Sequence, residues 1–254
     1  MLRFTPPRKF WATWATTSVT LALSLLASAV SAQKMDAPPT MTVGDKWTYQ
    51  FHDQGNKRDP YLYTNEVQRV DALSAWLYTE IQDPAEQTPK SIWRYDLKRA
   101  GLMERFAFSE TAPNGVGSRV NDRQKNDDLL QFPLEVGKKY AVKWFWRNEN
   151  GEGYTDYKAE VEAFEKVRVL AGEFDAFRIK YSGWWNNNSF TGRAEMTVWY
   201  APAGKREVKV EYLDRTRGNQ LWNQRVWQLV QWEPAGSRPA PPAPAASGAA
   251  SAPR

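Results

Sequence analysis

The stretch Val43-Gly44-Asp45-Lys46-Trp47 returns later in the chain as Val136-Gly137-Lys138-Lys139-Tyr140, and this repeat is the most informative feature of the sequence. Each copy opens an alternating run, with Trp47, Tyr49 and Phe51 in the first and Tyr140, Val142 and Trp144 in the second. Alternation with a period of two is typical of a half-buried β-strand. Further matches follow in the same order: Glu66-Val67 with Glu160-Val161, Trp76 to Ile81 with Phe174 to Ile179, and Trp93 to Gly101 with Trp199 to Gly204. Their shared order predicts a tandem duplication, although an aromatic-rich β-protein can also produce such echoes.

Between its two ends the chain alternates almost throughout, and Gly, Asn and Pro separate the alternating runs. The first half predicts strands over Tyr61–Val70, Trp76–Ile81, Ile92–Leu97 and Leu102–Phe108. The second half predicts strands over Tyr140–Arg147, Tyr154–Phe164, Val167–Leu170, Phe174–Ser182, Arg193–Tyr200, Glu207–Leu213 and Leu221–Trp232. We therefore expect an all-β fold of mostly antiparallel strands. It would be a sandwich or open barrel built from two tandem repeats of about five or six strands each.

The first residues have the pattern of a secretory signal peptide. Arg3, Arg8 and Lys9 form a basic start, Val19 to Leu26 are mostly apolar, and Ala29-Val30-Ser31-Ala32 supplies the small residues that a signal peptidase requires. The apolar run is shorter than the roughly 20 residues that cross a bilayer. We expect cleavage before Gln33, a periplasmic or secreted protein, and no stable membrane insertion after cleavage.

The expected organisation follows from these patterns. It is a signal peptide over 1–32, a first β-repeat over 33–110, a linker over 111–131, a second β-repeat over 132–232 and a tail over 233–254. The tail is almost entirely Pro, Ala, Gly and Ser, so it lacks the large apolar groups that offset the entropy of ordering, and we expect it to be disordered.

One part of the second half resembles known families. It combines Val169-Leu170-Ala171-Gly172-Glu173-Phe174-Asp175-Ala176-Phe177-Arg178-Ile179, Thr197-Val198-Trp199-Tyr200-Ala201-Pro202, and the opening Phe132-Pro133-Leu134-Glu135-Val136-Gly137-Lys138-Lys139-Tyr140. These motifs resemble exported bacterial β-rich domains of unknown function, with an AGxFxAxxI hairpin before a WYAP strand end. The chain departs from that pattern at Leu170, where Pro is usual, and at Lys205-Arg206-Glu207, which lengthen a turn. The resemblance implies a secreted β-domain and names no substrate.

The residues give few signs of catalytic chemistry. The chain has no cysteine and one histidine, His52, so neither a disulfide nor a His-rich metal site is expected. The charge of +5 includes Arg3, Arg8 and Lys9 of the leader, and the remaining charges are mixed, so no nucleic-acid partner is expected. We nominate no catalytic residue, metal or cofactor. A hydrolase that uses paired carboxylates stays open as an alternative, because the sequence cannot select a pair.

Tryptophan is the most distinctive residue of the chain, which has 13. Trp144 and Trp146 share one strand face, while Trp184 and Trp185 lie beside Gly183 at an expected hairpin tip. Odd positions in this strand belong to the apolar face, so Trp185 should be buried and Trp184 exposed. Such indoles pack in cores or bind ligands. We take Trp184, Trp185, Trp144 and Trp146 as candidate binding residues of a non-enzymatic protein. Its partner would be an amphipathic, lipidic or glycan ligand or an envelope protein, and a purely structural role is the other alternative.

Overall fold

The computed structural model describes residues 33–55, 57–83, 90–121, 128–148, 151–187 and 189–237. All of them belong to one unit of the chain, Ala32–Arg254. The predicted signal peptide lies outside the described residues, as does the predicted tail beyond Ser237. Among the described residues, no helix is both long and apolar enough to span a membrane.

Most of the described residues lie in β-strands. The first half contains β2 (Lys46–Asp53), β3 (Tyr61–Val70), β4 (Ser74–Gln82), β5 (Ser91–Asp96), β6 (Gly101–Phe108) and β7 (Val116–Asn121). The second half contains β9 (Lys139–Asn148), β10 (Gly151–Val169), β11 (Gly172–Asn187), β12 (Thr191–Ala201), β13 (Arg206–Thr216) and β14 (Leu221–Glu233). Two short strands, β1 (Lys34–Met35) and β8 (Leu134–Glu135), pair with each other, and a 3-10 turn, η1 (Pro113–Gly115), precedes β7.

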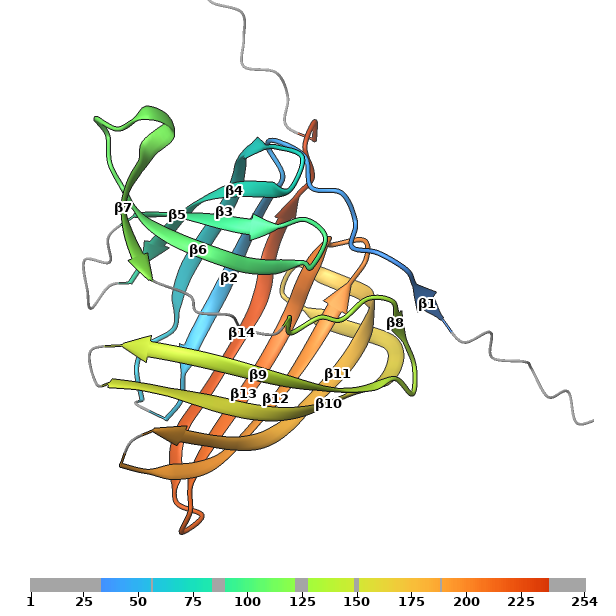
Figure 1. Cartoon of the computed structure of the whole chain (residues 1–254). Coiled ribbons are helices and arrows are strands. Elements are labelled where there is room, and N and C mark those ends of the chain that lie inside the picture. Colours follow the sequence, from blue (N-terminus) through green and yellow to red (C-terminus); the bar gives the residue numbers. More distant parts are fainter. Residues whose placement is uncertain are drawn as a thin grey trace, which may run out of the picture. The chain divides into compact units, whose positions relative to one another are not determined.

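The main sheet has 12 strands in the order β7-β6-β5-β4-β3-β2-β14-β13-β12-β11-β10-β9. It consists of two antiparallel meanders, β2 to β7 and β9 to β14, joined where β14 pairs with β2 near the middle (Figure 1). The edge strands β7 and β9 are not neighbours in this order, so the described sheet is open. The predicted all-β antiparallel class is confirmed.

Alternation of buried and exposed residues explains why these segments form strands. In β12 the even-numbered residues Ala194, Met196, Val198 and Tyr200 are buried, and the odd residues between them are more accessible. Successive side chains of a strand point to opposite faces, so this pattern places one face of the sheet in the core. The same period of two in the sequence predicted the strands.

The two meanders begin with the same turn. Gly44 and Gly137 both have positive φ, 95° and 91°. Gly44 N donates to Val67 O at 2.8 Å, and Gly137 N donates to Val161 O at 2.8 Å. A β-bulge follows both Val67 and Val161. Glycine is needed here because other residues rarely adopt such a φ.

A second shared feature lies at the end of the fourth strand of each meander, β5 and β12. The Tyr95 hydroxyl donates to Ala100 O at 2.5 Å, and the Tyr200 hydroxyl donates to Lys205 O at 3.4 Å. Ala100 and Lys205 both have positive φ, 48° and 59°. These features are what a duplication predicts, and the duplication itself stays a prediction.

The strand register changes the detailed matching of the two halves. Val67 pairs with Leu77, and Val161 pairs with Ile179. The register therefore places Leu77, and not Ile81, at the position that corresponds to Ile179. Sequence similarity alone aligned Ile81 with Ile179, which does not agree with this strand pairing. The alignment was displaced because β10 and β11 are longer than β3 and β4.

Three boundaries differ from the sequence expectations. β10 continues through the break expected after Phe164, and β11 continues through the expected tip to Asn187. Residues 116–121, inside the expected linker, form the edge strand β7. An edge strand pairs on one side only, so its sequence carries a weaker hydrophobic pattern.

The start of the expected tail is also part of the structure. Glu233 ends β14, and Ala235 N donates to Asp45 Oδ1 at 2.9 Å. Asp45 is fully buried and also accepts from Thr42 N at 2.7 Å and Lys205 Nζ at 2.6 Å. The described structure therefore extends past Glu233, which composition could not predict because it cannot show that a backbone N–H has a buried carboxylate as its partner.

Candidate ligand-binding site

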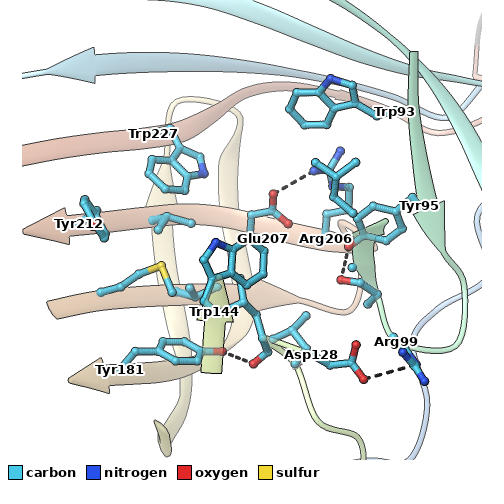
Figure 2. A pocket seen from close by; sticks show the side chains of 18 of the residues that line it. Trp93, Tyr95, Arg99, Asp128, Trp144, Tyr181, Arg206, Glu207, Tyr212 and Trp227 are labelled. Carbon is cyan, nitrogen blue, oxygen red and sulfur yellow. Dashed lines mark hydrogen bonds and ion pairs between the residues drawn. The ribbon is translucent and has the colours of Figure 1, made fainter. Parts of the chain in front are cut away.

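One face of the sheet lines a cavity of about 660 Å³, which we call the first cavity (Figure 2). Its walls come from both meanders and are mainly aromatic and apolar. They include Phe51, Tyr63, Trp93, Tyr181, Tyr212 and Trp227. This volume is within the range of about 300–1,000 Å³ that is typical of small-molecule sites.

Strand alternation delivers these side chains to the cavity. In β12 Met196 and Val198 line it, and in β13 Val210 and Tyr212 do, each pair being two residues apart. Their intervening neighbours point to the other face. The inner face is therefore set by the same period of two that identifies the strands.

The segment Asp128–Leu130 also lines the first cavity and is tied to both halves of the sheet. Leu129 O accepts hydrogen bonds from the Tyr140 hydroxyl at 2.8 Å and the Tyr181 hydroxyl at 2.6 Å. The Asp128 carboxylate pairs with Arg99 Nε at 3.5 Å. Burial raises the pKa of Tyr140 to about 12, so its hydroxyl stays protonated and can donate at neutral pH.

A buried ion pair stands in the wall of this cavity. Arg206 Nη2 donates to Glu207 Oε1 at 2.9 Å, and Arg206 is 4% exposed. The guanidinium carbon lies 5.3 Å from the ring centroid of Trp47 and 5.3 Å from that of Tyr95. Burial is the largest influence and lowers the pKa of Arg206, but Glu207 together with Tyr49, Tyr95 and Tyr63 more than offsets it, so the pKa of Arg206 lies above its usual value. The guanidinium therefore stays charged and packs between aromatic rings.

A second cavity of about 400 Å³ adjoins the first. The two share Trp144, Tyr157, Tyr212 and Arg225 in their walls. The second cavity is also lined by Thr155, Trp185, Asn187, Phe190, Asp214, Trp222 and Asn223, so it carries more polar side chains for its size.

The carboxylate of Asp214 is held in place inside the second cavity. Asn223 Nδ2 donates to Asp214 Oδ2 at 3.1 Å, and Arg225 Nη2 donates to Asn223 Oδ1 at 3.3 Å. Burial raises the pKa of Asp214, and hydrogen bonding to Tyr212 and Asn223 and the charge of Arg225 oppose this increase. Asp214 thus has an unusually desolvated carboxylate for a residue at a cavity wall.

Large apolar side chains are exposed at this end of the second meander. Phe190 is 64% exposed and Trp222 is 57% exposed, and both line the second cavity. Leu221 beside them is 48% exposed. Exposed apolar residues around a cavity are typical of sites where a ligand enters or a partner binds.

The structure brings together two of the four tryptophans selected from the sequence. Trp144 pairs with Thr155, and Thr155 pairs with Trp185, so the three side chains share one row on the inner face. Trp185 lines the second cavity, and Trp144 lines both cavities. The Trp146 side chain lies outside the described residues.

Trp184 lies on the opposite face of β11. It is 51% exposed, and the Arg193 guanidinium lies 5.7 Å from its ring centroid, whereas Trp185 is 8% exposed. The predicted burial of Trp185 and exposure of Trp184 are therefore confirmed. Trp184 lines neither cavity, so it does not belong to this candidate site.

Sequence reasoning missed the polar residues of the site. Lys205-Arg206-Glu207 was interpreted only as a lengthened turn, yet Arg206 and Glu207 stand in the cavity wall. Asp214 was not singled out, although it lies two residues from Tyr212 and shares its face. A charged residue in phase with apolar positions is the signal that could have identified Asp214.

The cavity carboxylates do not select the hydrolase alternative. Glu207 is bound by Arg206, Asp128 pairs with Arg99, and Asp214 is bound by Asn223. The fourth carboxylate, Asp96, accepts from Lys98 N and Arg99 N. His52 lines neither cavity. Among the described residues, no cluster of three or more His, Cys, Asp or Glu could hold a metal ion.

Comparisons with known proteins give a likeness in fold only. No family model matches the sequence, and no curated protein matches it. Similar solved structures include a Bacteroides fragilis protein assigned as exported, with a YmcC-like fold. It has 14% identity and a TM-score of 0.45, and the match covers 78% of this chain and 99% of that one.

Two further structures are similar to the chain. A Parabacteroides distasonis protein assigned as a lipoprotein has 16% identity and a TM-score of 0.46, with 79% of this chain and 100% of that one covered. The Escherichia coli hypothetical lipoprotein YmcC has 7% identity and a TM-score of 0.39, with 75% and 85% covered. These values carry no argument about what this chain binds.

Proposed function

We propose that this chain is an exported, non-enzymatic β-protein that binds an amphipathic small molecule in the first cavity. The observation that carries the proposal is the cavity itself, about 660 Å³ in volume and walled mainly by aromatic and apolar side chains. Burial of an apolar chain there would contribute about 25 cal/mol for each Å² removed from water. Its polar end would face the more polar second cavity.

The polar groups of the first cavity support binding more than catalysis. The Arg206–Glu207 pair is buried against aromatic rings, and the charge of each group is compensated by the other. A hydrolase that uses paired carboxylates needs carboxyl groups that can reach the reacting atoms. Here the tyrosines offer hydroxyl groups that burial keeps protonated, as shown by the raised pKa values of Tyr63, Tyr157 and Tyr212.

The test is a titration of the mature protein with N-phenyl-1-naphthylamine, an apolar probe whose fluorescence rises in apolar surroundings. We expect saturable binding that dodecyl amphiphiles reverse. Met196→Trp adds volume inside the first cavity and should weaken binding by at least about tenfold, a difference of about 1.4 kcal/mol. Met196→Leu roughly conserves volume and is the matched control.

Two results would overturn the proposal. One is the absence of saturable probe binding by a folded protein. The other is equal affinity of the Met196→Trp and Met196→Leu variants, which would place the probe elsewhere.

The exported location is part of the same proposal and has its own test. The leader over residues 1–32 supports it. Amino-terminal sequencing of protein recovered from the periplasm or medium should begin near Gln33. Full-length protein retained in the cytoplasm would contradict export.

A further inference from the structure

Two buried polar atoms in the second cavity have no hydrogen-bond partner among the described residues. They are Trp185 Nε1, which can only donate, and Asp214 Oδ1, which can accept. Both side chains are more than nine-tenths buried, with Trp185 8% and Asp214 7% exposed. The Tyr212 hydroxyl is near enough to influence the pKa of Asp214, but Oδ1 itself remains without a hydrogen bond. Buried polar atoms of this kind need a partner from solvent or from a ligand.

The chemistry of the two atoms restricts what that partner can be. A hydroxyl group both donates and accepts, so hydroxyl groups can serve the indole N–H and the carboxylate together. An ammonium group has no acceptor for Trp185. A phosphate or carboxylate group would accept from Trp185 but would meet the negative charge of Asp214.

The strand register places only small residues between the two side chains. Trp185 lies opposite Gly192, and Asp214 lies opposite Ala194, on neighbouring rows of the same face. A Cβ atom at Gly192 would lie 2.5 Å from Trp185 Cε2, so only glycine allows the indole to occupy this position. Gly192 and Ala194 are the residues of β12 that lie between these two side chains, so no side chain larger than a methyl group stands between Trp185 and Asp214 on this face.

An aromatic wall completes the site. The Trp222 ring centroid lies 6.3 Å from that of Trp185, and the two planes are inclined at 49°. Trp222 is 57% exposed, so one of its faces is available to a ligand. Stacking on the apolar face of a ring, combined with a few fixed polar groups, is a common way to bind a polar molecule in a cavity.

We propose that the second cavity binds the hydroxyl-rich, sugar-like headgroup of an amphiphile whose apolar chain occupies the first cavity. This inference rests on the proposed function, because the two cavities share walls at Trp144, Tyr157, Tyr212 and Arg225. The headgroup accepts a hydrogen bond from Trp185 Nε1 and donates one to Asp214 Oδ1. Trp222 covers its apolar face.

The experiment compares two amphiphiles with the same tail. Dodecyl maltoside and dodecyldimethylamine oxide, both below their micelle concentrations, displace N-phenyl-1-naphthylamine from the mature protein. We expect the maltoside to bind at least about tenfold more tightly, since two hydrogen bonds contribute about 1 kcal/mol each.

Two conservative variants test the named atoms. Trp185→Phe removes the indole N–H and keeps an aromatic ring, and Asp214→Asn keeps the shape of the side chain. Each should reduce the preference for the maltoside to within about threefold. Trp184→Phe, on the opposite face, is the matched control and should keep the full preference.

The outcomes separate the two proposals. If neither amphiphile displaces the probe, the proposed function fails. If both bind with equal affinity in the wild-type protein, amphiphile binding stands and the headgroup site is overturned, whatever the stability of the variants. Maltose that competes as strongly as dodecyl maltoside would overturn the placement of an apolar chain in the first cavity.

Discussion

The two meanders share a frame but differ in length. Each begins with a positive-φ glycine whose N–H bonds to the second strand, and each has a bulge in that strand. β3 and β4 contain 10 and 9 residues, whereas β10 and β11 contain 19 and 16. The second meander therefore extends well beyond the frame that the halves have in common.

The difference shows where the specific chemistry of this chain lies. Both meanders line the first cavity, but every residue that lines the second cavity lies between Trp144 and Arg225, in the second meander. The parts that both meanders share form the apolar walls of the first cavity. The longer strands of the second meander add the polar side chains and exposed aromatic rings of the second cavity.

The largest effect should come from Arg206, which belongs to the second meander but packs against Trp47, Tyr49 and Tyr95 of the first. Arg206→Met leaves Glu207 without its cation and should lower the free energy of unfolding by about 3–5 kcal/mol in urea titrations. The Arg206→Met/Glu207→Gln double variant should recover part of this loss. An unchanged midpoint for the single variant would show that the pair does not join the halves.

The next effect concerns Asp45, whose counterpart in the second turn is Lys138. Asp45 accepts from Ala235 N, whereas Lys138 Nζ donates to Pro133 O at 2.8 Å. Deletion from Glu233 onward should cost about 1–3 kcal/mol, because a buried acceptor loses its donor. Deletion from Arg238 onward is the control and should leave the melting temperature nearly unchanged. Equal melting temperatures for the two truncations would contradict this role of Ala235.

A smaller effect tests whether the opening turns are equivalent. Gly44→Ala and Gly137→Ala place a Cβ atom at positive φ and should each cost about 1–2 kcal/mol. Gly218→Ala, in a turn without positive φ, should stay within about 0.5 kcal/mol. Chemical denaturation measures all three. A large loss at one glycine and none at the other would break the correspondence between the halves.

The smallest effect should be a change in the pH dependence of stability at Asp214. This residue faces Tyr157, Tyr212, Asn223 and Arg225 in the second meander. The pKa of Asp214 is raised in the folded protein, so folding favours its protonated form. The resulting contribution to stability is fully present below the unfolded pKa of about 3.9 and is lost as pH rises through the folded pKa. The stability of Asp214→Asn relative to wild type should therefore improve from acidic to neutral pH. A difference that does not change with pH, measured by thermal melts, would exclude a raised pKa.

Much of the fold could be predicted because its signals are local. β3 occupies Tyr61–Val70 as expected, and the other predicted strands overlap strands of the structure. The orientations of Trp184 and Trp185 also followed from alternation. The edge strand β7 and the bond from Ala235 to Asp45 could not be predicted, because each depends on a partner far away in the chain.

Local sequence patterns were enough to predict the strand class, the turns and the face on which each side chain lies, since these depend on the conformational preferences of neighbouring residues. The tertiary structure was needed to show that Val67 pairs with Leu77 as Val161 pairs with Ile179, that Arg206 is buried among aromatic rings, and that Trp185 and Asp214 line one cavity. These properties depend on the register between strands that are distant in sequence. Register follows from the packing of the whole sheet, and no local pattern specifies it.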